Sequence, residues 1–147
     1  METSVKMDLF GGGLYIPVRL WSKSENSFRW ISLTFDTGAT ITTLSPEIFH
    51  ELGYEPSSKP KAKATTASAV EHVSHFTIDA IKIGDIELND VDAYALKFPE
   101  ESFSVGVVGL NVLRQFDLEL LFSQRIIRLK QLCYCRNTIT GNKGVIL

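Results

Sequence analysis

The sequence predicts a mostly β domain that closes into a barrel, and three observations lead to this expectation. Short segments in which apolar and polar residues alternate recur along the chain, a pattern typical of half-buried strands. Turn signals separate several of them, such as Gly84 and Asp85 between two apolar segments. Helical patterns cover only two short segments. Many short strands joined by tight turns favour a closed barrel.

Length and composition fit one globular domain without a nucleic-acid or membrane partner. The 147 residues suit a single domain, and an apolar content of 44% suffices for a normal core. The formal net charge of −2 gives no basic excess for nucleic acid. No apolar run approaches the roughly 18 residues of a membrane-spanning helix. The start of the chain lacks a signal-peptide pattern, which predicts a cytoplasmic location.

We expect three parts along the chain. Residues 1–13 end in the run Gly11–Gly13, which lacks the spacing of a phosphate loop, and are predicted to be a flexible lead-in. Residues 14–130 form the folded domain. Residues 131–147 form a polar tail with an apolar end at 145–147.

In the first third of the domain the alternation predicts strands. The first is expected at 14–21, where Pro17 favours an edge position. A polar turn at 22–27 leads to the second strand at 28–35. Residues 40–44 are rich in β-branched residues and are predicted to be extended.

Helix signals occur at two places. Ser45 suits the N-cap of a helix, Pro46 suits its first position, and Gly53 suits its end. Residues 110–116 carry apolar side chains at spacings of three, which predicts a second short helix.

The rest of the domain is predicted to be β. Residues 64–73 are small, polar and weakly apolar, which favours a projecting hairpin over a core strand. Residues 105–109 are apolar and β-branched, as in a strand that is buried on both faces. The other strands are expected at 76–83, 86–88, 91–96, 118–122 and 125–129.

One acidic residue is placed as a catalytic acid would be. Asp36 directly follows the strand at 28–35 and lies on its polar side, opposite Leu33 and Phe35. The carboxylate is therefore held at the end of a packed strand but outside the core. Gly38 permits a sharp turn or a close backbone approach here. The alternative is that Asp36 is an ordinary turn residue, since Asp and Gly favour turns.

No metal or other cofactor is expected. Cys133 and Cys135 are poorly spaced to bridge each other, and free thiols are favoured over a metal-binding or interchain role. The histidines are scattered without zinc-like spacing. His72 and His75, together with Glu71, are expected to be solvated.

Three separated elements resemble the retropepsin-like aspartic proteases. They are the run Asp36–Thr40 after an apolar strand, the pair Thr66 and Ala67, and the run Val107–Gly109 followed by Leu110 and Asn111. The resemblance spans about residues 14–130. It implies a closed retropepsin-like (acid protease) β-barrel with two short helices and a flap hairpin.

The resemblance also implies that the chain is half of an active site. The sequence holds one Asp-Thr-Gly and is too short for a second lobe, so a homodimer is required for catalysis. The two Asp36 carboxylates would share a proton and hold a water, which attacks the carbonyl of an extended peptide or protein substrate. The expected function is that of an aspartic endopeptidase.

Residue roles follow from the same resemblance. Thr37 would hydrogen-bond across the dyad, Gly38 would offer backbone groups to the substrate, and Ala39 would leave room for it. The remaining expected site residues are Thr40 in the catalytic loop, the flap residues Thr65, Thr66, Ala67, Ser68, Ala69 and Val70, and the packing residues Val107, Val108, Gly109 and Asn111.

The sequence departs from the family pattern at two positions. Ala69 stands where the flap usually has glycine, and Leu110 stands where retroviral members have arginine. These departures keep a second interpretation open, a non-catalytic retropepsin-fold module for dimerisation or peptide binding. A weaker third interpretation is a small-ligand barrel without a dyad. The apolar end of the tail at 145–147 is expected in the dimer interface.

Overall fold

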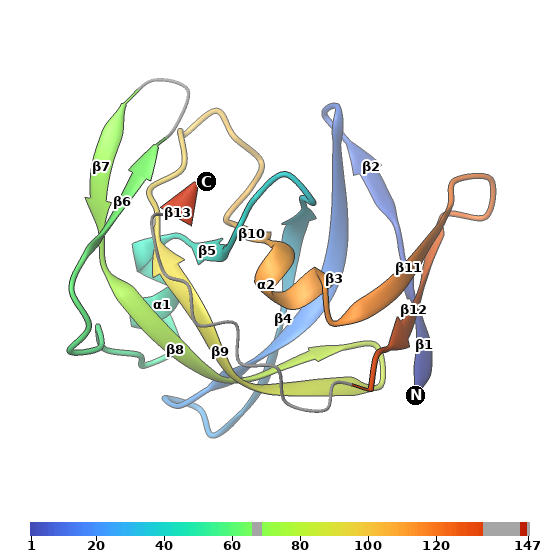
Figure 1. The fold of residues 1–147 in the computed structure, drawn as a ribbon, viewed down its shortest axis with the longest axis horizontal. Coiled ribbons are helices and arrows are strands. Elements are labelled where there is room, and N and C mark those ends of the chain that lie inside the picture. The colour runs from blue at the N-terminus through green and yellow to red at the C-terminus, as the bar shows by residue number, and fades with distance from the viewer. Residues whose placement is uncertain (66–68, 134–144, 147) are drawn as a thin grey trace.

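The computed structural model describes residues 1–65, 69–133 and 145–146 of the chain (Figure 1). Strands dominate, and the two helices are short. One seven-stranded sheet curves round until β3 (Gly13–Ser22) pairs with β8 (His75–Ile83), at Arg19 with Lys82 and Leu20 with Ile81. This pairing closes the sheet, so the predicted mostly β fold with a closed barrel is confirmed.

Six strands form the closed barrel, and β2 (Asp8–Phe10) extends it as a neighbour of β3. In order around the barrel they are β3, β4 (Ser27–Phe35), β10 (Gly106–Val108), β5 (Thr42–Leu44), β9 (Ile86–Ala95) and β8.

The period-two alternation fills the barrel. On β3, Ile16, Val18 and Leu20 are fully buried, and the residues between them are partly exposed. Ile16 pairs with Leu33 of β4, which is buried as well. Because the side-chain period of a strand is two, this pairing brings both apolar sets to the same inner face.

The helix α1 (Pro46–Glu51) starts and ends where the sequence predicts. Ser45 is its N-cap in extended conformation, although its side chain makes no capping hydrogen bond. Gly53 follows the helix with φ +82°, a conformation that glycine adopts without steric cost. Phe49 is buried and stacks on Phe76, with ring centroids 3.9 Å apart. The second helix, α2 (Leu110–Leu113), is shorter than the predicted segment.

The first thirteen residues are not a flexible lead-in, and this expectation is wrong. A three-stranded sheet in the order β1-β12-β11 contains β1 (Glu2–Lys6), β12 (Ile126–Gln131) and β11 (Phe116–Leu121). Val5 and Met7 are buried in the main core. Gly11 and Gly12 both have positive φ and form the two-residue turn from β2 to β3. The apolar side chains before the glycines therefore fix this segment.

A third sheet carries the predicted projecting hairpin. In the order β13-β6-β7 it contains β13 (Val145–Ile146), β6 (Ala62–Thr65) and β7 (Val70–Val73). We call β6 and β7 the flap hairpin. The expected flap residues Thr66, Ala67 and Ser68 lie outside the described residues, as do 134–144 and 147 of the expected tail. Within the described ranges no helix is long and apolar enough to cross a membrane.

The packing of residues 1–13 gives a testable prediction. Met7→Ala should lower the free energy of unfolding by about 2–4 kcal/mol, because Met7 is 1% exposed and its loss leaves a cavity. Chemical denaturation measures this. Ser4→Ala, a change at an exposed position of β1, is the control and should shift stability by less than about 0.5 kcal/mol. Equal stabilities of the two variants would mean that the segment does not pack on the core.

Candidate active site

Asp36 lies where the chain leaves β4 and crosses towards β5. Its backbone N–H donates to Val108 O of β10 at 3.2 Å, and its own carbonyl accepts from Ala39 N–H at 3.3 Å. The first bond holds the backbone of Asp36 against β10, and the second closes the turn of its loop. The position that the alternation of β4 predicts for the carboxylate, outside the core, agrees with its partial exposure.

The carboxylate is held by its own loop. Oδ1 of Asp36 accepts a hydrogen bond from the backbone N–H of Gly38 at 2.8 Å. A Cβ atom at Gly38 would lie 3.1 Å from this oxygen, so glycine suits the turn. Thr37 and Gly38 are exposed, whereas Ala39 is 5% exposed. A reactant can therefore approach the loop from the side of Thr37.

The floor of this loop is built by β10 and α2. β10 pairs in parallel with β4 and antiparallel with β5, so it lies between the two strands that the loop joins. The first backbone N–H groups of α2 donate to the loop, from Leu110 to Ala39 O at 2.8 Å and from Asn111 to Thr40 O at 3.2 Å. Helix-end N–H groups that have no intrahelical partner are thus satisfied by carbonyl groups of the Asp36 loop.

Gly109 permits this close approach. A Cβ atom there would lie 2.4 Å from the carbonyl carbon of Ile41 and 2.9 Å from the backbone nitrogen of Thr42. Any side chain at Gly109 would therefore push the loop away from α2. Val108, directly before it, is 1% exposed and packs in the core, and Val107 is partly exposed.

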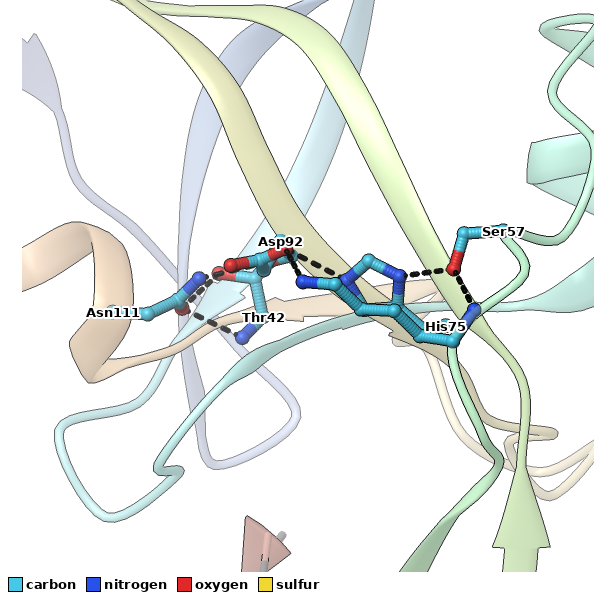
Figure 2. Close-up of polar contacts among 6 residues, drawn as sticks. Thr42, Ser57, His75, Asp92 and Asn111 are labelled. Atoms are coloured by element: carbon cyan, nitrogen blue, oxygen red, sulfur yellow. Dashed lines mark hydrogen bonds and ion pairs between the residues drawn. The ribbon is translucent and has the colours of Figure 1, made fainter. Parts of the chain in front are cut away.

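The side-chain amide of Asn111 holds the end of the loop by hydrogen bonds (Figure 2). Its Oδ1 accepts from the backbone N–H of Thr42 at 2.8 Å and from Thr42 Oγ1 at 2.9 Å. Its Nδ2 donates to Asp92 O at 2.8 Å. Thr42 Oγ1 in turn accepts from Gly109 N–H at 3.2 Å. The fully buried Thr42 thus has its polar atoms satisfied.

His75 continues the network from Asp92 to Ser57, as Figure 2 shows. Its Nδ1 lies 2.6 Å from Ser57 Oγ, and its Nε2 lies 2.7 Å from Asp92 Oδ1. Lys59 Nζ is 3.7 Å from the same carboxylate oxygen. Burial raises the pKa of the neighbouring Tyr94 hydroxyl above its ordinary value, and the charge of Asp92 adds to the rise.

The expectation that His75 is solvated is wrong, because the ring is 2% exposed and both nitrogens have partners. Glu71 and His72 are exposed, as expected. The roles of Ser57 and Asp92 were not predicted. They come from separate parts of the chain, and no local sequence pattern predicts that both contact the imidazole of His75.

The flap hairpin packs next to the Asp36 loop. Ala64, Val73 and Tyr94 form a small buried cluster, and Ile41, which follows the loop, packs against it. Thr65, Ala69 and Val70 are exposed near the hairpin end. The predicted loop and flap residues therefore lie on neighbouring elements wherever the structure describes them.

The described residues supply a single carboxylate to this loop. None of the ion pairs found among them includes Asp36. Asp36 is also the start of the one Asp-Thr-Gly in the sequence. Cys133 is an exposed free thiol, and Cys135 lies outside the described residues.

Comparison with known proteins bears on this arrangement. Residues 27–115 match the model of a family described as "gag-polyprotein putative aspartyl protease". Among solved structures, the chain is similar to the crystal structure of a retropepsin-like aspartic protease from Rickettsia conorii, with a TM-score of 0.63 and 19% sequence identity. The match covers 88% of this chain and 89% of that chain. No curated protein matches the sequence.

The two comparisons support different statements. At 19% identity the Rickettsia structure shows the fold alone, and it confirms the expected retropepsin-like barrel. The family model covers more than half of the chain and runs from the start of β4, before Asp36, past the end of α2. The chain therefore belongs to the family of gag-polyprotein putative aspartyl proteases, the retropepsin-like aspartyl proteases that its loop and barrel resemble.

Proposed function

We propose that this protein is a homodimeric aspartic endopeptidase that hydrolyses peptide bonds in extended substrates. The observation that carries the proposal is the position of Asp36. Its carboxylate is partly exposed, and its loop is held by backbone hydrogen bonds with β10 and α2. Family membership adds the reaction class. The missing second carboxylate comes from Asp36 of a second copy.

The chemistry follows from two carboxylates held a few ångströms apart. Since like charges at that distance repel, the pair shares one proton. The ionised carboxylate accepts a proton from the water as the water attacks the peptide carbonyl carbon. The protonated carboxylate donates its proton to the carbonyl oxygen, which gives a tetrahedral gem-diol. The proton taken from the water then passes to the peptide nitrogen, the other carboxylate takes a proton from the gem-diol, and the C–N bond breaks to release the amine and the acid. Each Asp36 acts as base or acid, and the enzyme forms no covalent intermediate.

The surrounding loop would keep this geometry fixed. Gly38 N–H orients one oxygen of Asp36 and leaves the other free to face the water. Thr37 is exposed and free to hydrogen-bond with the partner's loop across the dimer axis. Because rates depend steeply on the placement of reacting groups, the rigid floor of Gly109 and Asn111 would contribute to catalysis without touching the substrate.

The substrate would bind as an extended strand between the loop and the flap hairpin. Main-chain hydrogen bonds to a sheet edge suit peptides of varied sequence. Thr65, Ala69 and Val70 are exposed on the two sides of the hairpin end, where they can meet such a peptide. If the dyad is not active, the same surfaces would bind a peptide or a second copy without cleavage. The protein would then be the non-catalytic peptide-binding or dimerisation module of the second interpretation.

Substitution of the aspartate tests the enzyme proposal. Asp36→Asn should lower kcat/KM at least about a thousandfold, because the amide can neither accept the proton of the water nor share one. Cleavage of a mixed peptide library, followed by mass spectrometry from acidic to neutral pH, measures this. Asp85→Asn removes the same charge from an exposed turn and serves as the control, with unchanged activity. A wild-type dimer that cleaves nothing would contradict the enzyme proposal and favour the non-catalytic module. Equal cleavage by wild type and Asp36→Asn would indicate a contaminating protease.

Mixing tests the shared site. At a fixed concentration of wild type, an equal amount of Asp36→Asn should reduce activity to about half, and a ninefold excess to about one tenth, because mixed dimers hold one aspartate. The mixture must equilibrate long enough for subunits to exchange, which native mass spectrometry can follow. Activity that is insensitive to the excess variant, although mixed dimers form, would contradict a site shared between two copies.

A further inference from the structure

The strand β13 occupies one edge of the flap hairpin. It runs parallel to β6, with Val145 opposite Ala64 and Ile146 opposite Thr65. The sheet order is β13-β6-β7, so β13 takes the edge of β6 that β7 leaves open. In the view of Figure 1, β13 lies between the flap hairpin and β5, the strand that follows the catalytic loop.

This edge is the one that an extended substrate would need. β6 leads directly into the hairpin end, and Ala64 is fully buried in the cluster that packs against Ile41. The base of the flap hairpin therefore contacts the segment that leaves the catalytic loop. A peptide that binds there by strand addition must use unpaired main-chain groups of β6. In the structure, the chain's own residues already pair with that strand.

We infer that Val145 and Ile146 form an autoinhibitory segment, which occupies the substrate edge of β6 and competes with the substrate peptide. The inference rests on the proposed function, because it concerns the same site. The segment is extended and β-branched, and it is paired as an added strand, so it resembles in form the ligand that it would exclude.

The short length of the segment limits its affinity for β6, whereas its covalent attachment to the same chain raises its effective concentration. Two paired residues make few main-chain hydrogen bonds, so the isolated contact is weak. A tethered segment nevertheless acts at an effective concentration on the order of millimolar. Binding of substrate must first displace it, whereas the bound complex then reacts normally. The expected signature is an increased KM with an unchanged kcat.

Proline substitution tests the pairing within the whole chain. The double substitution Val145→Pro and Ile146→Pro removes both backbone N–H groups of β13, so that neither residue can donate a hydrogen bond to β6. The double substitution to threonine keeps both N–H groups and β-branching, and is the matched control. Hydrogen exchange followed by mass spectrometry, without substrate, should show peptides containing Ala64 and Thr65 exchanging about tenfold faster in the proline variant alone.

Two further measurements test the inhibition. In the active enzyme, the proline variant should show a KM about three- to tenfold lower than wild type, with kcat unchanged. In the Asp36→Asn background, a fluorescein-labelled peptide of the sequence Lys143–Leu147 should bind more tightly by the same factor when the prolines are present. This second readout does not depend on peptide cleavage.

The outcomes separate this inference from the proposed function. If no peptide is cleaved but exchange and peptide binding change as expected, the protease proposal fails, and competition for the β6 edge stands. Unchanged exchange at Ala64 and Thr65 would overturn the pairing. Faster exchange with unchanged KM and unchanged peptide affinity would overturn the inhibitory role.

Discussion

The structure of the candidate site depends on one close backbone contact, the passage of β10 between β4 and β5. A glycine flanks this contact on each side. A Cβ atom at Gly106 would lie 2.7 Å from Thr43 O, and one at Gly109 would lie 2.5 Å from Ile41 O. Because these neighbours are backbone atoms, no side-chain rotation can relieve the overlap. The contact brings α2 close enough to donate to the loop of Asp36.

The polar network below the loop extends this constraint across the barrel. Buried polar groups are costly unless each finds a partner, so a satisfied network favours one arrangement of the chain. Here the side chain of Asn111 joins Thr42 to the backbone of Asp92, and the side chain of Asp92 meets His75. His75 lies two residues beyond the end of β7. The floor of the Asp36 loop and the start of β8, the strand that follows the flap hairpin, thus share one set of hydrogen bonds.

The sequence allowed the barrel and the position of Asp36 to be predicted because both depend on local patterns. Alternation places Leu33 inside and Asp36 outside, whatever the rest of the chain does. The run Gly11–Gly13 led to the wrong prediction of a flexible segment, because glycine is common both in flexible linkers and in tight turns. Gly11 and Gly12 form a turn here because the apolar residues before them, such as Met7, find the core. The buried state of His75 depends on Ser57 and Asp92, which only the tertiary fold brings together.

The proposed enzyme would be governed by two equilibria with different dependence on concentration. Formation of the dyad needs a second copy, so dilution disfavours it. The contact between β13 and β6 lies within one chain, and dilution leaves it unchanged. At low protein concentration both effects would keep Asp36 inactive, one by removing its partner and the other by filling the flap edge. Assembly alone would restore the dyad but not free the edge. A substrate peptide must therefore compete for β6 even in the complete dimer, and peptides with strong strand propensity would be favoured.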